Sequence, residues 1–118
     1  MNRRKERLEH ELMIIISEIL IRQIRDPRIG FVTVNSVELS NDLITANVFV
    51  SVFGDDEVKT KSIEGLKSAT KRIQEIVAHR IKIKNIPHIQ FTLDETIEKA
   101  MKLDKILDEI SKEIQDPE

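Results

Sequence analysis

The sequence predicts a single α+β domain, with helices packed on one face of a small three-stranded sheet. Three observations lead to this class. Helical and strand-like segments follow one another in the order α-β-β-α-α-β-α, the chain has 118 residues, and 40% of them are apolar. A chain of this length buries roughly two-thirds of its unfolded surface, which is enough for one core. We therefore expect one domain over residues 1–118, with its core at about 3–110 and a frayed tail at 111–118.

Residues 3 to about 25 have the apolar period of an amphipathic helix. Leu12, Ile15 and Ile19 recur every three or four residues, and charged side chains occupy most of the other positions. The helix is expected to end before Pro27, because a residue that precedes proline is pushed out of the helical region.

Two strands should follow and form a hairpin. Residues 31–39 are rich in β-branched and aromatic types, residues 40–42 (Ser-Asn-Asp) are typical of a turn, and residues 43–53 alternate. One face of the second strand carries Ile44, Ala46, Val48, Val50 and Val52. Such alternation indicates a sheet with one covered face and one wetter face.

The second half of the chain contains two further helical stretches, a third strand and a last helix. Periodicity at 57–69 and 70–80 fits one helix, a kinked helix or two helices. Residues 88–93 alternate polar and apolar side chains, as a half-buried strand does. Asp94 is expected to cap a final helix that runs to about residue 115 and packs on the sheet. Its apolar stripe consists of Leu103, Ile106, Leu107, Ile110 and Ile114.

Composition excludes several classes of function. Without cysteine there is no disulfide, no catalytic thiolate and no cysteine-ligated zinc. No run of about 18 apolar residues exists that could span a membrane, and the basic start leads into no signal-type apolar segment. We expect a soluble, cytoplasmic protein.

The sequence carries no pattern of an enzyme. His10, His79 and His88 are far apart, and three glycines cannot build a glycine-rich phosphate loop. The acidic run at 55–57 has the chemistry to bind a divalent cation, but acids at a helix start more often complement the helix dipole. We therefore expect no catalysis, no metal and no cofactor.

Charge is distributed unevenly behind a net value of −2. Residues 67–84 carry six bases and one acid, whereas residues 94–118 carry four bases and nine acids. A basic cluster can neutralise phosphates, although a solvated helix face is the alternative interpretation. The candidate phosphate contacts are Lys67, Lys71, Arg72, Arg80, Lys82 and Lys84, with Arg3, Arg4 and Arg7 as a weaker second group.

The aromatic content limits how such a surface would bind nucleic acid. The chain has no Trp or Tyr, and its four Phe lie on expected strands in core-like surroundings. A platform that stacks bases is therefore disfavoured. Recognition would depend on phosphates and on shape.

Five motifs in the same order resemble the ribosome-binding factor A family. They are RDPRIGFVTV at 25–34, VELSNDL at 37–43, ANVFVSV at 46–52, PHIQF at 87–91 and DETIE at 94–98. Each motif is short, but together they cover about residues 2–110 in register.

The resemblance implies a type II KH-like fold of the order α-β-β-α-α-β and a role without catalysis. Members of this family bind the small ribosomal subunit, contact its ribosomal RNA and assist its late maturation, notably in the cold. In the family pattern, an Ala-x-Gly kink between two helices faces the RNA. By register that kink comprises Ser68, Ala69 and Thr70, and Lys71 stands where the family has glycine.

Replacing glycine by lysine should alter the backbone at this kink. Glycine relaxes the chain and lets a phosphate approach closely, whereas lysine adds charge and requires a more ordinary φ. We expect a straighter or differently kinked helix pair, in which Lys71 is itself a phosphate contact.

The function expected from these observations is that of a monomeric ribosome assembly factor that binds RNA of the maturing small subunit. Two alternatives stay open. One is a general KH-type RNA-binding module that acts off the ribosome, and the other is a protein–protein adaptor that uses the acidic helix at 94–114. An open sheet edge also leaves dimerisation possible.

Overall fold

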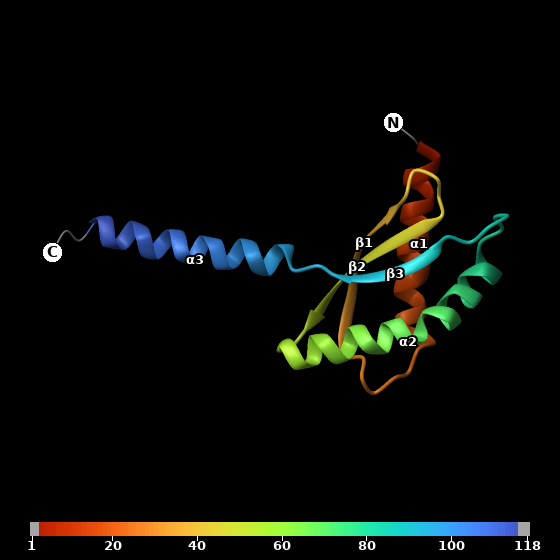
Figure 1. Cartoon of the computed structure of the whole chain (residues 1–118), viewed down its shortest axis with the longest axis horizontal. Coiled ribbons are helices and arrows are strands. Elements are labelled where there is room, and N and C mark those ends of the chain that lie inside the picture. The colour runs from red at the N-terminus through yellow and green to blue at the C-terminus, as the bar shows by residue number, and fades with distance from the viewer. Residues whose placement is uncertain (1–2, 116–118) are drawn as a thin grey trace.

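The chain forms three helices and one three-stranded sheet (Figure 1). The computed structural model describes residues 3–115, with the side chains of 97–99 and 113–115 excepted. The elements are α1 (Arg3–Arg22), β1 (Phe31–Leu39), β2 (Thr45–Phe53), α2 (Asp56–Arg80), β3 (His88–Leu93) and α3 (Thr96–Gln115). Strand β2 lies in the centre, antiparallel to β1 and parallel to β3. The predicted α+β class is confirmed, and the element order is consistent with a KH-like fold.

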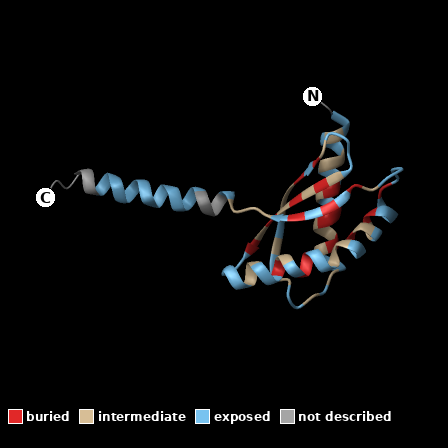
Figure 2. Ribbon diagram, in the orientation of Figure 1, coloured by how far each residue is buried: buried red, intermediate tan, exposed pale blue. Residues whose placement is uncertain are grey.

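Helices α1 and α2 cover the same face of the sheet and enclose the core (Figures 1 and 2). Alternation in β2 places Ala46, Val48 and Val50 fully inside this core, as predicted. Ile44 precedes the strand and is 63% exposed, so the covered face begins two residues later than expected. The helices contribute Leu12, Ile16, Ile19, Leu66, Ile73 and Val77, all fully buried.

The segment between α1 and β1 is a rigid turn that α2 packs against. The Asp26 carboxylate accepts hydrogen bonds from the Arg28 backbone N–H at 2.9 Å and from its guanidinium Nη2 at 2.7 Å. These bonds hold the pKa of Asp26 below its ordinary value. Gly30 then donates its N–H to the fully buried Ser62 hydroxyl at 2.9 Å. At Gly65 an added Cβ would lie 2.6 Å from Cγ1 of Ile29, so glycine lets α2 approach this turn closely.

The stretches at 57–69 and 70–80 form one continuous helix, α2, of 25 residues. Of the alternatives that periodicity left open, the structure has a single helix, and the observed order is α-β-β-α-β-α. The axis of α2 changes direction part of the way along (Figure 1). Thr70 donates its hydroxyl to the carbonyl of Leu66 at 3.0 Å, a contact that bends helices without breaking them. Lys71 is compatible with this helical backbone, because lysine has a higher helix propensity than glycine.

Helix α3 projects away from the sheet instead of packing on it (Figure 1). Its described side chains, at 96, 100–112, are all exposed (Figure 2). Leu103 and Leu107 are 56% and 53% exposed, respectively. The expected packing of this helix is thus wrong, because α1 and α2 already occupy the apolar face of the sheet. Ile114 lies outside the described side chains, whereas residues 111–115 of the predicted frayed tail are helical.

The start of α3 is tied to the sheet by one carboxylate. Asp94 accepts hydrogen bonds from the Thr96 hydroxyl at 2.6 Å and its backbone N–H at 3.0 Å, which confirms the expected capping role. The amide of Asn35, at an irregularity in β1, donates to Asp94 at 3.2 Å and to the Ser51 hydroxyl at 2.7 Å. These donors, the Thr96 hydroxyl foremost, lower the pKa of Asp94.

Candidate nucleic-acid interface

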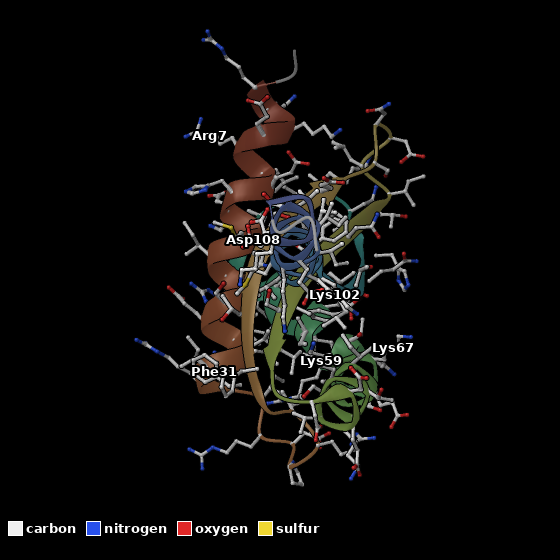
Figure 3. The ribbon with its side chains drawn as sticks, turned by 90° about the vertical axis from the view of Figure 1, so that its left-hand side faces the viewer. Arg7, Phe31, Lys59, Lys67, Lys102 and Asp108 are labelled. Carbon is white, nitrogen blue, oxygen red and sulfur yellow. The ribbon has the colours of Figure 1, made fainter. Side chains whose placement is uncertain are left out.

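Lys67 and Lys71 lie one turn apart on the exposed side of α2. Figure 3 shows Lys67 pointing outward from the helix. Arg72 is also exposed, about 100° further round the helix. None of these three cations forms an ion pair with an acidic side chain in the described part of the chain. Their charges are therefore available to a ligand.

The loop between α2 and β3 presents Lys82 and Lys84 to solvent. Ile81 anchors the start of this loop, with 8% of its surface exposed, and Pro87 is fully buried at its end. The chain is extended at Ile81. Lys82 and Lys84 are exposed, and so is Ile83 between them, with 37% of its surface exposed.

Arg4 and Arg7 join these two lysines around one groove, which has a volume of about 840 Å³. Three segments that are distant in sequence form it: the N-terminal part of α1, the β1–β2 turn and the α2–β3 loop. Figure 1 shows all three at the same end of the molecule. Sequence reasoning treated the N-terminal arginines as a separate group, but the fold places two of them beside Lys82 and Lys84.

A second depression adjoins this groove between α2 and β3. Lys67 and Lys71 line it, and Ile86 lines both depressions. The term basic surface is used below for these two depressions and their six cations, which are Arg4, Arg7, Lys67, Lys71, Lys82 and Lys84.

Two polar residues of this surface were not singled out from the sequence. The side-chain carbonyl of Gln74 accepts the Ile89 backbone N–H at 3.3 Å, which leaves its amide hydrogens for a ligand. Asp42 lines the groove as an acid, and the Ser40 hydroxyl at 2.6 Å lowers its pKa. One helical turn separates Gln74 from Thr70 and Lys71, and that spacing is the signal that would have identified it.

Three of the predicted contacts lie apart from the basic surface, and Arg72 is one of them, because it lines neither depression. Arg80 forms an ion pair with Glu18, with 2.8 Å between Nη1 and Oε2, and so connects the end of α2 to α1. Arg3 is exposed at the start of α1 but does not line the groove. Arg80 thus has a structural partner that the sequence did not reveal.

The described residues do not gather into a group that could hold a metal ion. Within the ranges given above, no group of three or more His, Cys, Asp or Glu side chains surrounds a possible metal position. His88 and His79 are exposed on different elements, and Asp94 is used to cap α3. In the same part of the chain, no helix is long and apolar enough to cross a membrane. The chemistry this surface supports is the binding of anionic groups.

Comparisons with known proteins agree on one family. The family model described as Ribosome-binding factor A matches residues 4–107. Ribosome-binding factor A of Natranaerobius thermophilus is 44% identical over 108 residues, which cover 92% of this chain and 82% of that protein. A Thermotoga maritima protein described as a putative ribosome binding factor A, solved by NMR, is 37% identical, with a TM-score of 0.72 over 83% of this chain and 95% of that one.

One similar structure comes from a ribosomal complex. It is a homology model of Thermus thermophilus ribosome binding factor A, fitted into a cryo-EM map of a 30S complex. It is 28% identical to this chain, with a TM-score of 0.63, and the match covers 75% of this chain and 92% of that one.

Proposed function

Because this chain belongs to the ribosome-binding factor A family, we propose that it binds RNA of the small ribosomal subunit through the basic surface. The observation that carries this proposal is the meeting of Arg4, Arg7, Lys82 and Lys84 around one groove. Two acids, Glu11 and Asp42, also line the groove, so its four cations leave it a net charge of +2. This excess of positive charge attracts an anionic ligand such as an RNA backbone, which releases counterions when it binds.

The mode of binding follows from the side chains that line the surface. They are mainly cationic and aliphatic, and no Phe, Tyr or Trp lines either depression, whose one imidazole is that of His88. Phosphate contacts position a protein without reading bases, so the shape of the folded RNA should determine where the protein binds. The Thermus thermophilus family member that was fitted into the map of a 30S complex supports RNA of the small subunit as the ligand.

We propose that this binding occurs late in the maturation of the subunit. The protein would act by binding alone and would not catalyse a reaction. The protein would hold one RNA conformation and leave when the site is complete. A monomer in the cytoplasm suits this role, as does a greater requirement in the cold, where misfolded RNA conformers exchange slowly. Cells that lack the protein should accumulate immature small subunits, and more of them at low temperature.

Co-sedimentation with purified small subunits at two salt concentrations tests the binding surface. The variant Lys82→Glu/Lys84→Glu should bind at least about tenfold more weakly, because two phosphate contacts become repulsive. Its dependence of log K on log salt should also become shallower by about 1.4, or 0.7 for each lost contact with single-stranded RNA. Lys61→Glu is the matched control, because Lys61 is exposed on α2 but paired with Glu57 at 2.9 Å, away from the surface.

If the double variant is folded by circular dichroism and binds as the wild type does, RNA does not bind at this surface. Tighter binding to free single strands than to subunits would favour the general RNA-binding module instead. Both outcomes contradict the proposal in different parts.

An adaptor role for α3 is the second candidate, because its apolar stripe is exposed. A chain that ends before Thr96 distinguishes the two. If the basic surface binds the subunit, this truncated chain should still co-sediment. If α3 recruits a protein partner, binding should be lost and should be insensitive to salt.

A further inference from the structure

The outer edge of β1 has no neighbouring strand, because the sheet order is β1-β2-β3. An apolar groove of about 500 Å³ runs along its first half. Leu20 and Ile21 of α1 form one wall, and the consecutive residues 30–34 form the other. Because four of these residues, 31–34, are consecutive in β1, the groove follows the strand.

The register of the sheet shows which backbone groups of β1 face this groove. The carbonyls of Ile44, just before β2, and of Val50 accept hydrogen bonds from the N–H groups of His88, which begins β3, and Asp94, which follows it. Even-numbered residues of β2 therefore turn their backbone groups away from β1. Val32 and Val34 are opposite Val52 and Val50 in the register. In an antiparallel pair, two residues opposite each other either both direct their backbone N–H and C=O groups toward the partner strand or both direct them away from it. The N–H and C=O groups of Val32 and Val34 therefore point outward into the groove.

Both ends of this open edge are closed by side chains. At one end the Glu9 carboxylate accepts the N–H of Leu39 at 2.8 Å. At the other end Ser62 accepts the N–H of Gly30 at 2.9 Å. Among the described residues, the outward groups of Val32 and Val34 have no such partner. Val37, opposite Val48, also turns its backbone groups outward. The edge is therefore open between these two closed ends, and its part at Val32 and Val34 lies along the groove, where another strand could pair with it.

The borders of the groove indicate the chemistry of that strand. Ile21 is 78% exposed and Phe31 75% exposed, and Figure 3 shows Phe31 beside the C-terminal end of α1. Arg25 lines an adjoining depression that shares Leu20 and Ile29 with the groove. Arg25 has no acidic partner among the described residues, whereas Arg28 is already paired with Asp26. One positive charge therefore stands at the end of an apolar channel.

We propose that the free edge of β1 binds an extended, acidic segment of a partner protein, which adds to the sheet as a fourth strand. Its backbone would pair with Val32 and Val34, an apolar side chain would lie between Ile21 and Phe31, and an acidic side chain would approach Arg25. Seventeen residues of α1, or about 25 Å, separate Arg4 from Ile21. This site is therefore distinct from the basic surface and does not depend on the proposed function.

A designed peptide tests the proposal on the full chain. The probe is an acetylated and amidated six-residue peptide that alternates valine with glutamate, titrated into ¹⁵N-labelled protein. We expect amide shifts at residues 30–34 and hydrogen exchange at Val32 and Val34 slowed by at least about threefold, because these amides become hydrogen-bonded. N-methylation of the peptide amides that face β1 should weaken binding by at least about tenfold, since those donors carry the pairing.

A pair of arginine variants tests the charge. Arg25→Glu should weaken binding about two- to fivefold, the range of an exposed ion pair. Arg22→Glu is the matched control, because Arg22 is equally exposed but lines neither depression, and it should bind as the wild type does. A peptide with lysine in place of glutamate should bind more weakly than the acidic one.

Three results would overturn the proposal. The first is a folded protein in which Val32 and Val34 do not respond to millimolar peptide. The second is binding that N-methylation leaves unchanged, since the edge would then not be paired. The third is concentration-dependent protection of Val32 and Val34 without peptide, together with a dimer in sedimentation, which would make a second copy of this chain the occupant.

Discussion

Helices α2 and α3 both carry an apolar stripe, yet only α2 uses it to build the core. Leu66, Ile73 and Val77 of α2 are fully buried. The corresponding residues of α3, among them Leu103 and Ile106, stay exposed. An apolar stripe therefore shows that a helix can be buried on one side, and it does not show what will cover that side.

The difference lies in what surrounds each stripe. α2 has two small residues, Ser62 and Gly65, that let its backbone approach the turn at 28–30. Gln74 adds a hydrogen bond to β3. The described part of α3 has no contact of this kind beyond its first turn, where Asp94 ties it to the sheet. Close approach and polar anchoring, added to periodicity, position a helix.

The comparison is tested most strongly by two matched truncations. Ile73→Ala should lower the free energy of unfolding by about 2–5 kcal/mol, because it leaves a cavity in the core. Ile106→Ala should change it by less than about 0.5 kcal/mol, because Ile106 is 47% exposed. Urea denaturation of the two variants measures both values. Equal losses would mean that α3 is packed in solution as firmly as α2.

The close approach at Gly65 can be removed while helix propensity improves. Gly65→Ala should gain up to about 1 kcal/mol in propensity. It should nevertheless destabilise the protein by about 1–2 kcal/mol, because the new Cβ would lie 2.6 Å from Cγ1 of Ile29. Ser68→Ala, on the exposed side of the same helix, is the control and should be neutral or slightly stabilising. A more stable Gly65→Ala protein would show that the turn at 28–30 yields easily.

The anchor of α3 should make a small, pH-dependent contribution. The pKa of Asp94 is lowered by hydrogen bonds from Thr96 and Asn35, so the folded state favours the ionised carboxylate. The resulting stability is present above the unfolded pKa of about 3.9 and is lost as pH falls through the lower folded pKa. Asp94→Asn should be less stable than the wild type at pH 6, and this difference should narrow as pH falls through the folded pKa of Asp94. The urea midpoint, followed from pH 6 to about pH 2.5, measures the effect. Parallel curves for both proteins would contradict a role of the ionised form.

Much of the fold followed from local patterns. Alternation at residues 44–52 located β2 to within two residues, and Pro27 marked the end of α1 to within about three. The number of helices formed by the stretches at 57–69 and 70–80 was harder to predict. Both have helical period, and only the continuous hydrogen bonding of α2 shows that they are one helix.

The candidate site was predicted in part. The lysines at 67, 71, 82 and 84 stood out as a basic block because they are close in sequence. The meeting of Lys82 and Lys84 with Arg4 and Arg7 could not be inferred, since these pairs are 75 to 80 positions apart in the sequence. The pairing of Arg80 with Glu18 was hidden for the same reason, because the two residues are 62 positions apart.

The sequence by itself determined which segments become helices and strands, which of their faces are apolar, and where positive charge is dense. These properties arise from the local period of side chains and from backbone preferences, both of which act over a few residues. The tertiary structure decided which apolar face is covered and which is left open, which distant cations share a groove, and which edge of the sheet stays unpaired. Such outcomes depend on competition for one limited surface. Once α1 and α2 cover the apolar side of the sheet, the described side chains of α3 beyond its first turn and the backbone edge at Val32 and Val34 have no partner among the described residues.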